Sequence, residues 1–238
     1  MRTREYGQFC GLARAAEAVG QRWALLILRD LLVGPRRYSD LAAGLPGIPT
    51  NSLATRLKEL EQDGLVTREI RSGHDRSVVY TVTPRGAELA PALDALARWG
   101  AAGMRTAREN EIVTTASLVS ALRVAAGDAR SADQRRLTYT VTVGDASAAV
   151  SMRDGVVQIE PGQASAADLV ITAGPRLRDL LAGTLDTDTA VATGAVTLDG
   201  DTSLFAPFTA AFDMPYSTAL PDHPDADRHP TGTRTDAN

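Results

Sequence analysis

The stretch that decides the fold of the first half of this chain is GQRWALLILRDLLVGPRRYSDLAAGLPGIPTNSLATRLKELEQDGLV, residues 20–66. Within it, residues 23–32 are apolar on nearly every side, which is typical of a helix at the centre of a core. The Gly-Pro pair at 34–35 ends this helix, and Ser39 is expected to cap a third short helix. A short helix over residues 10–19 comes before the stretch. The first half is therefore predicted to build its core around one apolar helix.

A fourth helix is predicted over residues 50–63, after a Pro-Gly turn at 46–47. At 100° per residue, Leu53, Leu57 and Leu60 fall within one narrow stripe that faces the core. The opposite face is polar and consists of Asn51, Thr55, Lys58 and Gln62. Short polar side chains near the start of a helix can reach base edges in the major groove of DNA. Taken alone, the pattern fits an ordinary amphipathic surface helix equally well.

A hairpin and a last helix complete this part of the chain. Residues 65–70 and 78–82 alternate as two strands around a polar turn. Pro84 then opens a helix that runs to residue 100, and its large apolar residues recur at helical spacing. The predicted order is thus several helices, a hairpin with a polar tip, and a final helix.

In this order of elements and motifs, residues 10–100 resemble the HxlR family of bacterial winged-helix regulators. The features that carry the resemblance are Cys10, Trp23, Gly34-Pro35-Arg36-Arg37-Tyr38, Pro46-Gly47-Ile48, the run 57–60, Asp63-Gly64-Leu65-Val66, Tyr80, Thr83, Gly86 and Leu89. One departure from the family is Pro49. Family members often have a serine there that caps the fourth helix, the one that reads DNA, so in this chain the cap is expected on Thr50. The resemblance implies a winged helix-turn-helix domain that binds double-stranded operator DNA and regulates transcription, most simply as a repressor. A homodimer is expected, because a lone winged helix reads few base pairs and the apolar faces of the first helix and of residues 89–99 exceed the needs of one small core.

Two kinds of DNA contact are expected from this domain. Short polar residues at the start of the fourth helix should read bases, whereas Arg56 and Lys58 should contact phosphate or form ion pairs. Arginines before the third helix and at the hairpin tip place positive charge on both flanks of that helix, although solvated loops with incidental arginines are the alternative. The predicted DNA-binding residues are Arg36, Arg37, Thr50, Asn51, Ser52, Thr55, Arg56, Lys58, Arg71, His74 and Arg76.

The charges of the chain are unevenly distributed. The formal net charge is −4, which by itself does not suit a nucleic-acid binder. Residues 1–110 carry 16 Arg and Lys against 12 Asp and Glu, whereas residues 111–238 carry 9 against 17. Such asymmetry is expected when a basic DNA-binding domain is joined to an acidic domain with a different function.

Several other classes of protein find no support in the sequence. The longest apolar stretch, residues 24–33, is interrupted by an Arg-Asp pair, and residues 1–20 lack a signal-peptide core, so we expect a cytoplasmic protein without a membrane span. No Gly-rich phosphate loop, metal-ligand cluster or paired nucleophile and base emerges, so neither an enzyme, a cofactor nor a metal site is expected. His223 and His229 could bind a metal, but a flexible polar tail is the favoured interpretation of that segment.

Cys10 is the single cysteine, so an intramolecular disulfide is excluded. Without a second cysteine as resolving partner or an adjoining basic residue, it is expected to be a small apolar residue rather than a redox sensor.

Beyond a polar link near residues 105–110 the pattern changes to a separate α+β unit. Its predicted elements are a helix over 112–125, strands at 137–143, 146–152, 156–160 and 169–172, a helix over 175–182, a strand at 195–198 and a helix over 204–212. The predicted fold class is α+β. The predicted domains are a winged helix-turn-helix DNA-binding and dimerisation domain over 1–105, an α+β ligand-binding domain over 106–214, and a disordered tail over 215–238.

The second unit resembles the sterol carrier protein fold, in which a sheet and helices enclose an apolar tunnel. The features are Asp168-Leu169-Val170-Ile171-Thr172, Leu180-Leu181-Ala182-Gly183 and Gly194-Ala195-Val196-Thr197-Leu198-Asp199-Gly200-Asp201. This resemblance implies a hydrophobic small-molecule effector. The residues that would line its cavity, or else fill the core, are Leu181, Leu204, Phe205, Phe208 and Phe212.

Because a fold does not fix a function, two hypotheses remain. The favoured one is a ligand-responsive transcriptional regulator. The alternative is a protein that sequesters a hydrophobic compound, with the DNA-binding module only targeting or regulating it.

Overall fold

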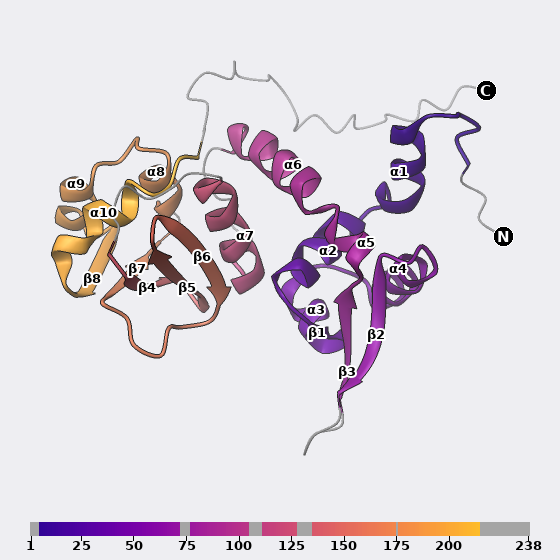
Figure 1. Cartoon of the computed structure of the whole chain (residues 1–238), viewed down its shortest axis with the longest axis horizontal. Coiled ribbons are helices and arrows are strands. Elements are labelled where there is room, and N and C mark those ends of the chain that lie inside the picture. Colours follow the sequence, from indigo (N-terminus) through magenta and orange to yellow (C-terminus); the bar gives the residue numbers. More distant parts are fainter. Residues whose placement is uncertain (1–4, 72–76, 105–110, 128–134, 175, 215–238) are drawn as a thin grey trace, which may run out of the picture.

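The computed structural model describes residues 5–71, 77–104, 111–127, 135–174 and 176–214. Two hydrophobic clusters organise these residues, one in each half of the chain. The first gathers around α2 and α4, and the second lies between a five-stranded sheet and the helices of the second half (Figure 1). The architecture is therefore mixed α/β, with a winged helix-turn-helix arrangement at the N-terminal side.

The N-terminal half alternates short helices with a small antiparallel sheet of strand order β1-β3-β2. Its elements are α1 (Gly11–Val19), α2 (Ala24–Val33), β1 (Arg36–Arg37), α3 (Tyr38–Gly44), α4 (Thr50–Gln62), β2 (Val66–Arg71), β3 (Ser77–Val82), α5 (Pro84–Ala87) and α6 (Ala90–Ala102). The apolar helix α2 lies at the centre, because Ala24, Ile27 and Leu28 are fully buried. The two strands predicted after α4 pair as the antiparallel hairpin β2–β3, with Val66 opposite Val82.

Two local predictions were wrong, and one strand was missed. Ser39 does not cap α3, because the helix already begins at Tyr38, and the Arg37 N–H donates to the Asp40 carboxylate at 2.9 Å. The two-residue strand β1, which pairs with β3, was not predicted. The last helix is broken into α5 and α6. Pro91 lies in the first turn of α6, where its ring and missing N–H are tolerated, whereas they would disrupt a continuous helix.

The C-terminal half is a sheet of strand order β6-β5-β4-β7-β8, in which only the β4–β7 pair is parallel. Its elements are α7 (Thr115–Ala126), β4 (Leu137–Val143), β5 (Ala146–Arg153), β6 (Val156–Pro161), β7 (Leu169–Ala173), α8 (Leu177–Leu181), α9 (Thr187–Ala192), β8 (Val196–Gly200), the 3₁₀ turn η1 (Thr202–Leu204) and α10 (Phe205–Thr209). Every second residue of β5 is buried, so one face of the sheet carries the core. Helix α9 was not predicted.

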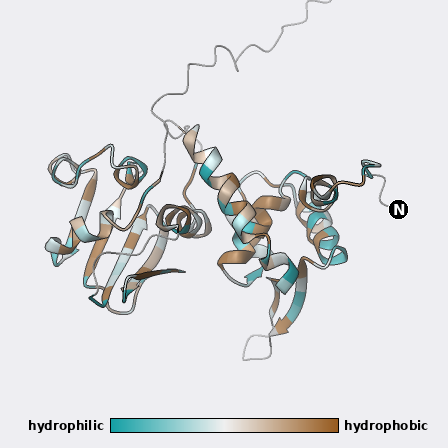
Figure 2. Cartoon of the chain, turned by 45° about the horizontal axis from the view of Figure 1, so that its top comes forward, coloured by the Kyte–Doolittle hydropathy of each residue, from teal (hydrophilic) through white to brown (hydrophobic). Residues whose placement is uncertain are grey.

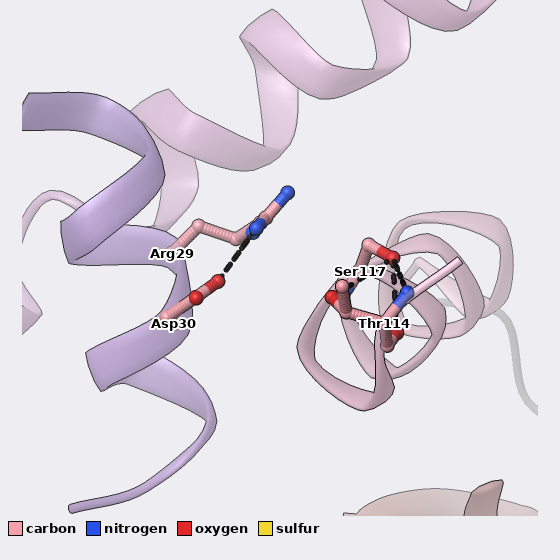
Figure 3. Close-up of polar contacts among 4 residues, drawn as sticks. All are labelled: Arg29, Asp30, Thr114 and Ser117. Carbon is pink, nitrogen blue, oxygen red and sulfur yellow. Dashed lines mark hydrogen bonds and ion pairs between the residues drawn. The ribbon is translucent and has the colours of Figure 1, made fainter. Parts of the chain in front are cut away.

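Helix α7 begins with a capping box that Figure 3 shows. The Ser117 N–H donates to the Thr114 hydroxyl at 3.1 Å, and the Thr114 N–H donates to the Ser117 hydroxyl at 2.8 Å. The helix therefore starts at Thr115, later than the predicted residue 112, and it packs on β5 and β6.

The two halves contact each other through α2, α6 and α7 (Figure 1). Val33 of α2 and Ala101 of α6 are buried within the hydrophobic cluster of the second half. Arg123 of α7 donates to two carbonyls, that of Leu32 at 3.2 Å and that of Ile159 at 3.1 Å. Because the last carbonyls of a helix lack intrahelical partners, Arg123 satisfies the end of α2 while it joins α2 to β6. No helix among the described residues is long and apolar enough to cross a membrane.

Candidate nucleic-acid interface

Helix α4 divides into a buried and an exposed face. Leu53, Leu57 and Leu60 are fully buried, as their spacing predicted. The side facing away from the core is exposed and carries Thr50, Asn51, Thr55, Lys58 and Gln62. Ser52 is half-buried at the edge of this face. The arrangement leaves a row of short polar side chains, followed by one cation, open to solvent on the second helix of the helix-turn-helix.

The start of α4 is fixed by α3. The Tyr38 hydroxyl donates to the Thr50 carbonyl at 2.8 Å, which ties the two helices of the motif together. The expected cap on Thr50 is wrong, because Thr50 is already helical and extended Pro49 occupies the capping position. Because proline has no side-chain acceptor, the capping position itself provides no side-chain hydrogen bond to the backbone N–H groups of the first turn.

The other end of α4 is held by the residues that follow the hairpin. The Thr83 hydroxyl donates to the Gly64 carbonyl at 2.6 Å, and Arg85 donates to the Asp63 carbonyl at 2.9 Å. Thr83 also caps α5, since its hydroxyl accepts from the Gly86 N–H at 3.1 Å. Sequence reasoning missed these positioning residues. The Thr-Pro pair at 83–84, a helix cap followed by proline at the first helical position, was the available signal.

Gly86 permits this close approach. A Cβ atom at this position would lie 2.1 Å from the Leu65 carbonyl oxygen, which belongs to the backbone just before β2. Since no side-chain movement relieves such a clash, only glycine lets α5 lie against the end of the α4–β2 segment. The orientation of α4 thus depends on contacts at both of its ends.

Arg56 is not presented to solvent like its neighbours. Its side chain is only 13% exposed and forms an ion pair with Glu59 one turn later. Of the two roles expected for Arg56, the ion pair is the one observed in the unbound chain. Lys58 lies on the exposed face.

The two arginines of β1 differ. Arg37 is exposed, whereas Arg36 is half-buried and its charge acts on Asp30. One terminal nitrogen of Arg36 is buried and has no hydrogen-bond partner among the described residues. Arg37 is therefore the better placed of the two for a phosphate contact.

Asp30 is a buried carboxylate in the central helix. It is 2% exposed and forms an ion pair with Arg29 at 2.6 Å (Figure 3). Burial raises the pKa of Asp30, and the charges of Arg29 and Arg36 and a hydrogen bond from Arg29 oppose that rise. Asp30 thus offsets positive charge inside the winged helix and has no exposed surface with which to meet DNA.

The tip of the hairpin contributes three predicted residues whose side chains cannot be placed. His74 and Arg76 lie outside the described residues, as does the side chain of Arg71. On the described part of β2, Arg68 is exposed. It adds a cation to the wing that sequence reasoning did not select.

The five residues predicted to line a ligand cavity lie in the core of the second half. Leu181, Leu204, Phe205, Phe208 and Phe212 are all buried in its hydrophobic cluster. The Phe208 ring packs against Tyr139 and Phe212, with ring centroids 5.2 and 4.8 Å apart. These contacts are those of core packing. Their role in ligand binding stays a prediction.

Large apolar side chains remain exposed on α1, on α6 and beside them. They are Tyr6, Phe9, Leu12, Leu96, Trp99 and Met104. Trp99 and Leu12 are each 79% exposed, so neither belongs to the core of a single chain. Figure 2 shows hydrophobic residues, in brown, interspersed with hydrophilic residues, in teal, along α6.

Cys10 lies between the exposed Phe9 and Leu12 in the sequence, at the capping position of α1, and is exposed. Backbone hydrogen bonds from Ala13 and Leu12 lower the pKa of its thiol.

Comparison with known proteins agrees with this geometry. The family model described as HxlR-like helix-turn-helix matches residues 18–108. An uncharacterized HTH-type transcriptional regulator of Synechocystis sp. is 34% identical over 96 residues, which are 40% of this chain and 71% of that protein. The uncharacterized HTH-type transcriptional regulator YvaP of Bacillus subtilis is 36% identical over 86 residues, 36% of this chain and 80% of that protein.

Among solved structures, the reduced form of the B. subtilis transcriptional regulator YodB is 31% identical, covers 41% of this chain and 97% of its own, and superposes with a TM-score of 0.37. The family match ends at residue 108 and so concerns the N-terminal half. The relatives named here are transcriptional regulators, and the chain belongs to the HxlR-like helix-turn-helix family.

Proposed function

We propose that this protein is a homodimeric transcriptional regulator that reads operator DNA with α4 and represses until its C-terminal half binds an apolar small molecule. The observation that carries the DNA-binding part is the exposed polar face of α4. That face contains Asn51 and Thr55, and contacts from Tyr38, Thr83 and Arg85 fix the helix at both ends. A rigidly held reading helix costs little ordering entropy when it enters a major groove.

The homodimer is proposed from the exposed apolar side chains of α1 and α6. Large apolar side chains that stay exposed outside the core of one chain can mark an interaction site. A second copy that covers Leu12 and Trp99 would also supply a second reading helix, so the operator should contain two half-sites about 10 or 20 base pairs apart. A monomer in sedimentation at micromolar concentration would contradict this assignment.

The test of DNA binding uses promoter fragments from the gene's own locus in a fluorescence anisotropy assay with the full chain. Specific binding should exceed binding to a scrambled fragment by about three orders of magnitude or more at physiological salt. Thr55→Ala should remove discrimination at one position in each half-site, and Ala87→Ser, an exposed change on α5 and outside the reading helix, is the matched control. Equal affinity for all fragments would refute sequence-specific reading.

Ligand sensing is proposed for residues 106–214, whose acidic character separates them from the DNA-binding residues 1–105. Helix α6 connects the DNA-binding half to the C-terminal half, because Arg98 near the end of α6 donates to the Val124 carbonyl near the end of α7. A ligand that alters this junction would alter the spacing of the reading helices in a dimer. A tenfold preference for one spacing corresponds to about 1.4 kcal/mol of coupling.

The sensing experiment measures operator affinity of the full chain with and without a fatty acid probe. Binding of the probe that weakens operator affinity supports regulation. Binding that leaves operator affinity unchanged would refute the coupling and favour sequestration of a hydrophobic compound.

A further inference from the structure

An ion pair lies on one flank of the reading helix α4. Arg56 donates to the carboxylate of Glu59, which follows one turn later. The two side chains are only 13% and 26% exposed, whereas the neighbouring Thr55 and Lys58 are open to solvent. The pair therefore lies between the buried leucines of the helix and its exposed polar face.

The contact with Glu59 offsets the cost of keeping the Arg56 guanidinium on this flank. A guanidinium carries five N–H donors, which water satisfies when the group is exposed. The Nε atom of Arg56 is buried and has no hydrogen-bond partner within the part of the chain that the structure describes. A buried donor without a partner costs free energy, and the charged contact works against that cost. Removal of the carboxylate should therefore let the guanidinium turn outward to water or to a nearby anion.

Glu59 lies close to the face that reads DNA. It follows Thr55 by four positions, so at 100° per residue the two side chains are about 40° apart on successive turns of α4. A carboxylate at this place would repel the phosphates of a bound duplex if its charge were not balanced. Arg56 balances it, so the pair presents little net charge to DNA.

Few charges on α4 are free to meet phosphates. The helix contains two cations, Arg56 and Lys58, and two carboxylates, those of Glu59 and Glu61. Binding to DNA of random sequence depends on cations that neutralise phosphates. Because Arg56 is engaged by Glu59, Lys58 is the cation that the exposed face of α4 offers. Base contacts then make up a larger share of the affinity.

We propose that Glu59 determines the specificity of DNA binding by holding Arg56 away from the phosphates. This role rests on the proposed function, because it requires α4 to enter the major groove. On random DNA the helix can shift until a freed guanidinium meets a phosphate, whereas base contacts at the operator fix its register. Loss of Glu59 should therefore strengthen binding to random DNA more than binding to the operator.

Fluorescence anisotropy titrations of the full chain test this role, with the promoter fragment of the gene's own locus and a random duplex at several salt concentrations. On random DNA, Glu59→Ala should steepen the slope of log affinity against log salt concentration by about 0.9, the effect of one more phosphate contact. Between 1 M and 0.1 M salt this change amounts to about eightfold tighter binding, and the gain on the promoter fragment should be smaller. Glu88→Ala, which removes an exposed carboxylate at the end of α5, is the matched control and should leave the slope unchanged.

The double variant Arg56→Ala/Glu59→Ala separates a masked cation from one that already contacts DNA. Loss of a pair without net charge should return the salt slope to the wild-type value. A slope about 0.9 shallower than that of the wild type would overturn the proposal, because Arg56 would then contact a phosphate in the wild-type complex.

An unchanged slope in Glu59→Ala, or equal gains on both duplexes, would overturn the proposal as well. Circular dichroism verifies that each variant is folded. Wild-type protein that binds neither duplex would refute the proposed function together with this role. Wild-type protein that binds the promoter fragment specifically, with slopes that do not depend on Glu59, would refute the role of Glu59 alone.

Discussion

Replacement of Arg123 by alanine should uncouple the two halves of the protein. Arg123 contributes two hydrogen bonds, to the Leu32 carbonyl at 3.2 Å and to the Ile159 carbonyl at 3.1 Å. Hydrogen bonds from charged donors contribute about 1.5 to 3 kcal/mol each. Since the side chain is only half-buried, we take the lower end of that range and expect a loss of about 3 kcal/mol in the coupling between halves.

The tryptophans make this loss measurable. Trp23 and Trp99 both lie in the N-terminal half, so tryptophan fluorescence follows the unfolding of that half, whereas circular dichroism follows both. In urea, the two signals should change together in the wild type and separate in Arg123→Ala, because each half has its own hydrophobic cluster. Arg123→Lys, which can reach one carbonyl at a time, should give a partial separation.

Arg153→Ala is the control, since Arg153 is exposed at the end of β5 on the same sheet. Its two signals should remain together. Coincident transitions with an unchanged midpoint in Arg123→Ala would refute the reasoning, because they would show that the two carbonyl contacts contribute nothing to the junction.

Three further predictions concern the winged helix. Thr55→Ala should weaken the binding free energy by about 1 to 3 kcal/mol for the specific operator only. Lys58→Ala should weaken binding to operator and to random DNA alike, and it should lower the slope of log affinity against log salt concentration by about one. Equal losses of affinity for both variants in anisotropy titrations would contradict this division. Gly86→Ala should lower the free energy of unfolding by more than about 2 kcal/mol in urea, because its Cβ would meet the Leu65 carbonyl at 2.1 Å. Because burial raises the pKa of Asp30, the folded chain holds its proton to higher pH than the unfolded chain, so its contribution to stability should fall as pH rises through the interval from the ordinary carboxyl value to the raised one. Asp30→Asn should remove that slope from urea midpoints measured across this interval, and an identical pH profile in both proteins would contradict the assignment.

The reading helix was predictable because its determinants are local. The spacing of Leu53, Leu57 and Leu60 fixes which side of α4 is buried, and the same periodicity leaves Asn51 and Thr55 exposed. The two strands of the hairpin and the buried α2 follow from equally local patterns. The break between α5 and α6 could also have been predicted from the sequence, because proline disrupts the interior of a continuous helix and Pro91 follows the start of the predicted one.

Other features of the candidate site depend on partners far away in the chain. From the sequence alone, Arg36 is expected to be a surface cation. Its backbone pairs with Tyr80 in the small sheet, however, and this places its charge near the buried Asp30. The end of α4 is held by Thr83 and Arg85, about 20 positions later, through backbone carbonyls that carry no side-chain signal. Sequence patterns reveal which face of an element is apolar, but they do not reveal which carbonyl a distant guanidinium will reach.

The sequence by itself therefore determined the family, most of the helices and strands of both halves and the polar face of α4, because periodicity and turn residues act over a few positions. Only the tertiary structure decided how the halves meet. Arg123 lies 91 residues from Leu32 along the chain, and Asp94 and Glu160 come to one cavity from opposite halves. Such contacts arise from the packing of complete elements, whose relative positions are set by the whole core rather than by any local spacing.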